Sequence, residues 1–477
     1  MSQTKLELLY DLFDRWCGER VISINRLPAS GSPREYYRIA GTESTAVGAI
    51  NLDREENEAF IEFSRHFHSK GLTVPEIYLA DLDNNAYLQE DLGDTTLFDY
   101  LVSVRDNGNF PEVLKAIYKE VLTELQRFQV TGSQGLNYRV CYPRSSFDRQ
   151  SMQWDLSYFK YYFLKLAGVP FSEQQLEDDY NTLIEYLLAQ DTNYFLYRDF
   201  QSKNIMIRGG KPCFIDYQGG RKGAMQYDVA SLLYDSKADI PPDVREELLE
   251  HYIGGLSSYP GVDAEAFRES YYAYVLIRIM QAMGAYGFRG FYEKKTHFLQ
   301  SIPYALNDLK WILNNVEFSI EIPTLLKVFK KLLAAPKLKR FKDKGDRKST
   351  LTVSINSFSY RHGIPKDSSG HGGGYVFDCR VITNPGKLEQ YRSLTGKDQP
   401  VVNFLDQQDD VSEYLSSATS LVDMSVDKYE ARSYTHLMVS FGCTGGQHRS
   451  VYCAEKLAAH LRESQGVRIT LWHRELD

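Results

Sequence analysis

The spacing of apolar residues along the chain separates three regions. Residues 1–18 and 54–70 have apolar positions at helical spacing, whereas residues 20–52 and 75–93 show the pattern of strands joined by tight turns, with a hairpin turn at residues 83–85. From residue 95 to 190 and from 225 to 335 the pattern is mostly helical, with short apolar runs between these stretches. This order predicts a small strand-rich lobe followed by a larger helical lobe.

A different pattern follows residue 350. Strand-like runs at 350–360, 374–381, 435–442 and 467–476 alternate with helical patterns at 408–430 and from 450 onward. Such alternation predicts a separate α/β domain with a mainly parallel sheet. Just before it, residues 327–348 contain ten basic and two acidic residues, and this change of composition marks the best domain boundary.

The composition is that of a globular protein, with 43% hydrophobic and 25% charged residues. A net charge of −8 gives no general attraction to nucleic acid or anionic membranes, so such binding would need a local patch. The N-terminal stretch lacks the apolar core of a signal peptide, and no apolar run is long enough to predict a membrane span. Six cysteines in 477 residues are no disulfide framework, so we expect a reducing cytoplasm.

Residues spaced for phosphoryl transfer occur in the middle of the chain. Asp199 and Asn204 lie five residues apart in "YRDFQSKN", and Asp216 follows at the end of the next apolar run. Phosphoryl transfer needs one carboxylate to accept the proton of the attacking hydroxyl, and an amide oxygen and a second carboxylate to hold Mg²⁺. A lone Asp-x4-Asn more often caps a turn. The second aspartate and the strand-rich lobe upstream favour the chemical interpretation here.

Residues 20–310 resemble the aminoglycoside-phosphotransferase-like kinases. The resemblance is greatest to the AmgK-type subgroup, which phosphorylates the anomeric hydroxyl of N-acetylmuramate and N-acetylglucosamine during cell wall recycling. The matching stretches are "ASGSPREYYRI", "LTVPEIYLADLDNNAYLQEDLGDTTL", "YRDFQSKNIMI", "FIDYQGGRKGAMQYDVASLLYD" and "FRGFYEKKTHFLQSIPYAL". The resemblance implies a bilobal α+β protein-kinase-like fold that uses ATP and Mg²⁺. It further implies that Asp199 is the catalytic base and that Asn204 and Asp216 are the metal ligands.

The nucleotide side of this site departs from the family pattern. The resemblance places the hinge that faces adenine at residues 88–92, which include Gln89, Asp91 and Leu92. The strand lysine that usually grips the phosphates is missing from "TAVGAINLD", where Ala49 or Asn51 takes its position. Arg34 and Arg38 are candidates for the missing positive charge, and ordinary surface arginines are the alternative for each. The stretch with Ser30, Gly31 and Ser32 is a weak candidate for a phosphate cradle.

Further polar residues are candidates for contact with the acceptor. These are Gln218, Arg221, Arg278 and Gln281. An arginine in an apolar helix needs a partner, which for Arg278 is either a substrate group or a nearby acid. For Asp228 we expect a structural role, bracing the metal loop or capping the next helix.

A second candidate site lies near the end of the chain, in a strand–loop–helix unit. Its loop consists of Cys443, Thr444, Gly445, Gly446, Gln447, His448, Arg449 and Ser450. A glycine-rich turn before a helix N-terminus presents backbone N–H groups to an anion, Arg449 would add a fork for phosphate oxygens, and Ser450 would be the N-cap. The Cys-x5-Arg-Ser spacing also fits a cysteine phosphatase with Asp378 as its only candidate acid, but a small buried cysteine is the simpler interpretation.

Residues 350–477 resemble the C-terminal domain of the RapZ family. The matching pieces are "SFSYRHGIP", "YVFDCRVITNP", "LTGKDQPV", "GCTGGQHRSV" and "WHREL". The resemblance implies binding of small regulatory RNA and of a hexosamine phosphate. The N-terminal half of that family is a P-loop unit, yet this chain contains no G-x4-G-K-[ST] sequence. We therefore do not transfer the RNA-regulating function of the RapZ family to this chain as a whole.

Together these patterns predict four segments and one leading function. The segments are a nucleotide-binding lobe at 1–93, a helical lobe with the catalytic and metal loops at 94–325, a basic linker at 326–349 and an α/β domain at 350–477. The leading function is an ATP-dependent amino-sugar kinase whose tail domain binds a phosphorylated ligand. The alternatives are an RNA-binding adaptor, with RNA contacts through 327–348 and the tail domain, and a kinase of another small alcohol such as choline or an aminoglycoside.

Overall fold

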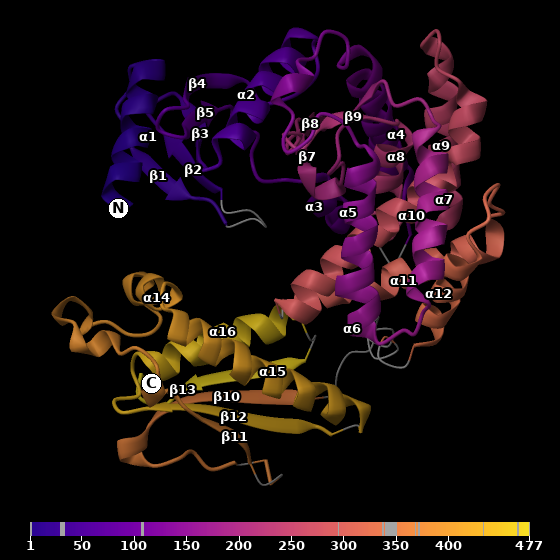
Figure 1. Cartoon of the computed structure of the whole chain (residues 1–477). Coiled ribbons are helices and arrows are strands. Elements are labelled where there is room, and N and C mark those ends of the chain that lie inside the picture. The colour runs from indigo at the N-terminus through magenta and orange to yellow at the C-terminus, as the bar shows by residue number, and fades with distance from the viewer. Residues whose placement is uncertain are drawn as a thin grey trace. The chain divides into compact units, whose positions relative to one another are not determined.

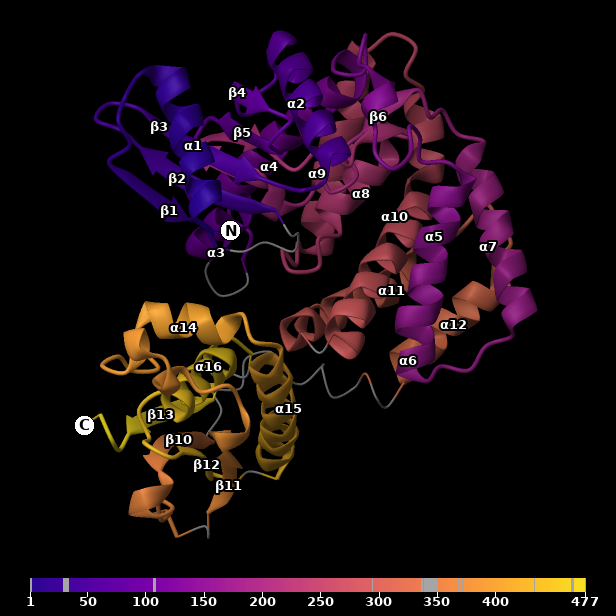
Figure 2. The ribbon, with the colours of Figure 1, turned by 60° about the vertical axis from the view of Figure 1, so that its left-hand side comes forward.

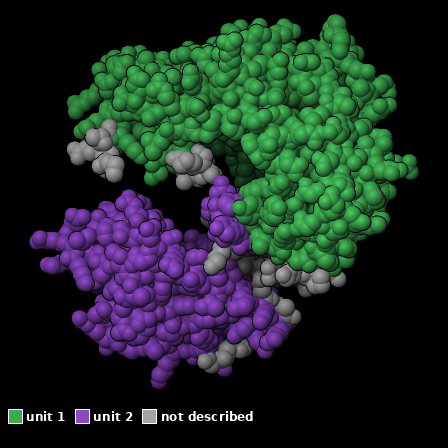
Figure 3. Space-filling model, in the orientation of Figure 1, with its two compact units in different colours: residues 1–287, 301–338 green, residues 288–300, 339–477 purple. Residues whose placement is uncertain are grey.

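A computed structural model describes residues 2–28, 34–105, 109–293, 295–335, 338, 351–367, 369–370, 373–432, 434–464 and 467–476. The chain forms two compact units, coloured separately in Figure 3. The first comprises residues 1–287 and 301–338, and the second comprises residues 288–300 and 339–477. The two units are described separately below.

The first unit begins with a five-stranded antiparallel sheet of order β1-β2-β3-β5-β4. The strands are β1 (Ser23–Arg26), β2 (Glu35–Ala40), β3 (Thr45–Ile50), β4 (Ile77–Asp81) and β5 (Ala86–Gln89). The helices α1 (Ser2–Cys17) and α2 (Arg54–Ser69) belong to the same lobe (Figure 1). Leu9, Leu12 and Phe13 of α1 pack against Ile39 and Leu88 of the sheet in a fully buried cluster. The elements expected between residues 1 and 93 are thus present.

The larger lobe of this unit is helical, and Figure 2 shows α5, α7 and α10 beside one another. Its helices are α3 (Leu97–Val104), α4 (Glu112–Gln126), α5 (Arg149–Phe159), α6 (Lys165–Ala167), α7 (Glu173–Leu188), α8 (Gln226–Leu233), α9 (Pro242–Gly255), α10 (Ala264–Tyr286), α11 (Ile302–Asn315) and α12 (Pro323–Ala334). Two short antiparallel ladders carry the loops of the candidate site. They pair β6 (Tyr194–Leu196) with β9 (Arg221–Gly223), and β7 (Ile205–Arg208) with β8 (Lys211–Phe214).

Two boundaries differ from those predicted by the sequence. The expected linker at 326–349 begins inside α12, whose residues Leu325, Val328, Phe329 and Leu332 are buried in the first unit. The apolar stripe of this helix outweighs its lysines, which lie on the other face. Residues 288–300 belong by their contacts to the second unit, although the sequence places them in the helical lobe at 94–325. Of residues 335–350, only 335 and 338 are described.

The second unit contains a four-stranded, fully parallel sheet of order β11-β12-β10-β13. Its elements are β10 (Thr352–Ser359), β11 (Gly374–Asp378), β12 (His436–Cys443), β13 (Arg468–His473), α14 (Gln399–Asp406), α15 (Asp409–Ala431) and α16 (Arg449–Ser464). Alternate residues such as Val353, Ile355 and Val439 face a buried core that they share with Val422 and Leu457 of the helices. The predicted parallel α/β domain is confirmed.

Two negative findings concern the described residues. None of their helices has the length and apolar character needed to span a bilayer. All six cysteines of the chain lie in the described parts, and none forms a disulfide.

Candidate functional site

The loop between β6 and β7 carries Asp199, and its backbone conformation depends on a buried carboxylate. Arg198 takes a left-handed conformation, with φ of 83°. The carboxylate of Asp228, on α8, accepts hydrogen bonds from the backbone N–H groups of Tyr197 (2.7 Å) and Arg198 (3.0 Å). Asp228 is fully buried, and it braces the catalytic loop rather than the metal loop.

The side chain of Arg198 fixes the same loop to the helical lobe. Its guanidinium donates from Nη1 to Asp155 Oδ2 (2.8 Å) and from Nη2 to Asp155 Oδ1 (2.6 Å), and it donates a further bond to the hydroxyl of Tyr227 (2.8 Å). The guanidinium carbon also lies 5.0 Å from the ring centre of Phe147. This bidentate pair prevents the residue next to Asp199 from rotating.

The three residues predicted for phosphoryl transfer meet in one place. Asn204 donates from Nδ2 to the backbone oxygen of Asp199 (2.9 Å) and to Oδ2 of Asp216 (2.8 Å). Asp216 lies two residues after the end of β8 in a left-handed conformation, with φ of 69°. The amide of Asn204 therefore joins the loop of Asp199 to that of Asp216.

The charge and donor set of this cluster fit a divalent cation. Burial raises the pKa of Asp216 to about 6, and the nearby carboxylate of Asp199 adds to this effect. A cation beside the two carboxylates would remove their repulsion. Because Asn204 donates both bonds from Nδ2, its Oδ1 can serve as a ligand. Carboxylate and amide oxygens suit Mg²⁺, which also takes ligands from substrate phosphates.

A chain of contacts runs from Asp216 to helix α2 of the sheet lobe. Gln218 donates to Oδ1 of Asp216 (2.7 Å) and to Oε1 of Glu56 (3.4 Å). Glu56 also accepts from Nδ2 of Asn51 (2.7 Å), and its Oε2 lies 3.2 Å from Nη2 of Arg34. The side chain of Arg34 is only 2% exposed. Glu56 thus has a buried arginine from the start of β2 as its cationic partner.

The candidate hinge has a buried half and a charged half. Gln89 and Leu92 are 8% exposed, and Leu92 packs against Met206 and Cys213. Asp91 accepts from Nε of Arg38 (2.6 Å). Arg38 also contacts Asp94, so its charge is used at the hinge and does not replace the missing lysine. Ser30, Gly31 and Ser32 lie outside the described residues.

The four residues proposed for contact with the acceptor have protein partners, and Gln281 is one partner of Arg278. Gln218 belongs to the metal side, as described above. Arg278 donates to the hydroxyl of Ser231 (2.8 Å) and to Oε1 of Gln281 (2.9 Å), so neutral groups satisfy it rather than an acid. Arg221 donates to the backbone oxygen of Gly219 (2.9 Å), beside Asp199.

In the second unit, the predicted loop follows β12 at the carboxyl edge of the parallel sheet. The sulfur of Cys443 accepts a bond from the backbone N–H of Gly446 (3.1 Å) and lies 3.2 Å from the hydroxyl of Ser450. Gly446 has φ of 72°. Among the described residues, the backbone N–H groups of Gly445, Gln447 and His448 have no acceptor. These N–H groups remain available for an anion.

One expectation for this loop is wrong, and another concerns a side chain that is partly bound. Arg449 is 6% exposed, and its Nη1 donates to the backbone oxygens of Arg380 (3.0 Å) and Ile382 (3.1 Å), so this nitrogen anchors the segment after β11. Its buried Nε has no hydrogen-bond partner among the described residues. Ser450 is not an N-cap, because α16 begins at Arg449. The sequence shows the types of these residues but not the direction of their side chains. Asp378 is bound by Arg380, which leaves a buried Cys443 without an assigned acid.

Sequence reasoning gave no role to Glu56, Asp155 or Glu475. Glu475 accepts from the backbone N–H of Ser359 (3.1 Å) and from His362 (2.7 Å) beside the loop of the second unit. Each of the three residues acts on a partner at least 22 residues away in the chain. No local pattern marks them, although the first-turn acid of α2 gave a weak indication for Glu56.

Comparison with known proteins gives two family matches that together cover most of the chain. The model of the phosphotransferase enzyme family matches residues 23–264, and that of the RapZ C-terminal domain matches residues 351–477. A nucleotide-binding protein of Xylella fastidiosa (strain M12) is 40% identical over 127 residues, which are 27% of this chain and 42% of that protein. The RNase adapter protein RapZ of Yersinia enterocolitica is 38% identical over 133 residues, which are 28% of this chain and 45% of that protein. The chain therefore spans less than half the length of these relatives.

Two solved structures match part of this chain. Choline kinase LicA from Streptococcus pneumoniae has a TM-score of 0.40 at 14% identity, and the match covers 70% of this chain and 99% of that one. Amicoumacin kinase hAmiN, in complex with AMP-PNP, Ca²⁺ and Ami, has a TM-score of 0.42 at 12% identity, covering 70% and 97%. By its match over residues 23–264, the chain belongs to the phosphotransferase enzyme family, with a kinase-like fold to which a RapZ C-terminal domain is joined.

Proposed function

We propose that this protein is an ATP- and Mg²⁺-dependent kinase of an amino sugar, with N-acetylmuramate or N-acetylglucosamine as acceptor at the anomeric hydroxyl. The observation that carries the proposal is the junction of Asp199, Asn204 and Asp216 through the amide of Asn204. The use of ATP and six unpaired cysteines support the cytoplasm as its compartment.

In the proposed reaction Asp199 acts as the general base. Its carboxylate accepts the proton of the acceptor hydroxyl while the hydroxyl oxygen forms a bond to the γ-phosphorus and the bond to ADP breaks. Asn204 and Asp216 would hold Mg²⁺, which when bound neutralises charge on the phosphate oxygens. The pair of Arg198 and Asp155 keeps the base in position. Positioning and charge stabilisation account for most of the rate in this reaction class.

Arg34 is our candidate for the role of the missing strand lysine. Ala49, which is fully buried, lies opposite Tyr36 on β2 and Tyr87 on β5 and brings no charge. Arg34 precedes Tyr36 by two residues and pairs with Glu56 on α2, the helix beside the sheet. The guanidinium is held by Glu56, and its charge acts to lower the pKa of Asp216. It would supply the positive charge that phosphate oxygens need.

A panel of acceptors with ATP and Mg²⁺, monitored by ADP release, tests the kinase. We expect turnover with amino sugars, and we expect Asp199→Asn to lower kcat by roughly 10²–10⁴, the usual contribution of a general base. Asp11→Asn is the matched control, since Asp11 is exposed on α1 and pairs only with Arg15 among the described residues. Turnover that persists in Asp199→Asn would refute the assigned role of Asp199.

For the second unit we propose binding of a phosphorylated sugar at residues 443–450. The free backbone N–H groups of Gly445, Gln447 and His448 support this, while Nη1 of Arg449 is bound to backbone oxygens after β11. Calorimetric titration of the full chain with glucosamine 6-phosphate should give binding, and titration with glucosamine should not. Equal heats for the two sugars, or none for either, would reject a phosphate site.

An RNA-binding adaptor is the second candidate function. It is favoured by the match to the RapZ C-terminal domain and by the name of the Yersinia enterocolitica relative. Phosphate contacts would make its affinity fall steeply with salt. Salt-sensitive RNA binding by a chain that turns over no acceptor would support this function over the kinase.

A further inference from the structure

The strand β5 ends at Gln89, whose side-chain amide is buried without a hydrogen bond. Gln89 is 8% exposed, and its Oε1 is shielded from solvent. Within the part of the chain that the structure describes, neither end of this amide has a hydrogen-bond partner. A buried acceptor without a donor destabilises the fold, and a ligand that supplies the donor recovers this free energy.

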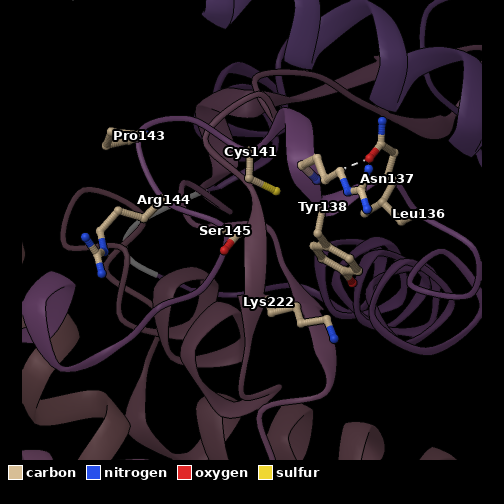
Figure 4. Close-up of a pocket in the computed structure, with 9 residues that line it drawn as sticks. Leu136, Asn137, Tyr138, Cys141, Pro143, Arg144, Ser145 and Lys222 are labelled. Carbon is tan, nitrogen blue, oxygen red and sulfur yellow. Dashed lines mark hydrogen bonds between the residues drawn. The ribbon is translucent and has the colours of Figure 1, made fainter.

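Two other side-chain amides of the first unit, one buried and one exposed, are bonded. Gln129 is fully buried and donates from Nε2 to the backbone oxygen of Met225 (2.9 Å). Asn137 lines an open pocket of about 690 Å³, and its Oδ1 accepts from the backbone N–H of Arg139 (3.2 Å), the dashed line in Figure 4. Gln89 differs from both of them, because the protein offers its amide no partner among the described residues.

The alternation of side chains along the sheet shows which way Gln89 faces. Leu88, one residue earlier, packs against helix α1. A Cβ atom on Gly48, opposite Leu88, would lie 2.7 Å from Cδ2 of Leu9 in that helix. Successive residues of a strand face opposite sides of the sheet. Gln89 and its neighbour across the ladder, Val47, therefore lie on the face turned away from α1.

The same face of the sheet leads to Asp216. Tyr87 precedes Gln89 by two residues, about 7 Å along the strand, and faces the same side. The ring centre of Tyr87 lies 5.4 Å from that of Phe60 on α2. Phe60 in turn stacks on Tyr217, the residue after Asp216, with ring centres 5.1 Å apart. A row of packed rings thus joins the position of Gln89 to the metal cluster.

The helical lobe supplies an apolar wall beside the same strand end. Leu92, three residues after Gln89, packs against Met206. Ile215, which directly precedes Asp216, packs on the same cluster. This wall therefore also runs from the hinge toward the metal cluster. An apolar wall suits the flat face of a nucleotide base, whose polar edge is then left for a polar side chain.

We infer that the amide of Gln89 selects a 6-aminopurine nucleotide by accepting a hydrogen bond from the exocyclic amine of its base. The inference rests on the proposed kinase function and names a residue that determines its nucleotide specificity. The amide nitrogen can donate at the same time to a ring nitrogen beside the amine, the pair of bonds by which glutamine recognises adenine. A base without the amine leaves Oε1 buried and unpaired, which lowers its affinity.

Two nucleotides that differ only in the amine test the inference. Purine riboside triphosphate is ATP without its 6-amino group. Calorimetric titration of the full chain with each nucleotide and Mg²⁺, without acceptor, should give a Kd for ATP about tenfold below that for purine riboside triphosphate. Gln89→Leu removes the amide at similar volume and should raise the Kd for ATP about tenfold. It should leave the Kd for purine riboside triphosphate within about threefold, because that base makes no bond to Oε1.

Gln175→Leu is the matched control, because Gln175 is exposed on α7, and it should leave both Kd values unchanged. Equal affinities of the unchanged chain for the two nucleotides, or equal losses of both in Gln89→Leu, would overturn the inference while leaving an ATP-binding kinase intact. If neither nucleotide binds, the proposed function fails and the inference fails with it.

The Tm of the chain without nucleotide separates recognition from a structural role of Gln89. Gln89→Leu should have a Tm equal to or above that of the unchanged chain, because it removes an unpaired buried amide. A fall in Tm of about 2 °C or more would show that the amide is bound within the protein, and this would overturn the inference.

Discussion

Replacing Asp155 by asparagine should destabilise the first unit more than any exchange of a surface charge. Asp155 and Arg198 are 9% and 15% exposed, and two hydrogen bonds of 2.6 and 2.8 Å join them. Although burial opposes the charged form, Asp155 raises the pKa of Arg198. Loss of one partner leaves a buried, unpaired guanidinium, which costs about 3–5 kcal/mol. For the first unit, with an entropy of unfolding of about 2.1 cal/mol/K per residue, the loss corresponds to roughly 4–7 °C in Tm.

Differential scanning calorimetry of the full chain measures this shift. The matched control is Glu250→Gln, which breaks an equally bidentate pair with Arg268 whose side chains are 55% and 44% exposed. We expect that control to cost less than about 1 kcal/mol. Changing both partners, as Asp155→Leu with Arg198→Met, should restore part of the stability, because no charge is then left buried. A Tm for Asp155→Asn within about 1 °C of the control would refute the reasoning.

Two further predictions concern single positions with close controls. Gly446→Ala should lower the Tm of the second unit by the equivalent of about 2 kcal/mol, because φ is 72° and the new Cβ would lie 2.3 Å from Cγ of Glu475. In Gly445→Ala, the control, the new Cβ meets no atom within 4 Å, so its Tm in calorimetry should be nearly unchanged. Arg34→Gln should lower kcat/KM for ATP about 10²-fold, and Arg34→Lys should recover part of this loss. The control Arg26→Gln, at an exposed residue of β1, should leave kcat/KM for ATP unchanged. Full activity of Arg34→Gln in the ADP-release assay would contradict the lysine-like role.

Much of the fold followed from local patterns. The hairpin turn at 83–85 was predicted from its turn residues, and Asn85 indeed has a positive φ of 56°. The parallel sheet after residue 350 followed from the alternation of strands and helices, because parallel neighbours need long crossovers. The linker was predicted to begin at residue 326 from the change in charge composition. The first unit extends further, because one face of α12 is buried in it.

The sequence by itself determined which chemistry the chain can carry. The spacing of Asp199, Asn204 and Asp216 is a property of one loop and one strand end, so a short stretch of chain specifies it. Only the tertiary structure decided how the charges are used. In the folded chain Arg38 binds Asp91 at the hinge, and Arg34 pairs with Glu56. Arg449 is bound to a backbone oxygen of Arg380, and Lys222 lies beside the segment around Arg139. The physical reason is that a residue type fixes what a side chain can bind, whereas its partner depends on packing between segments distant in the chain.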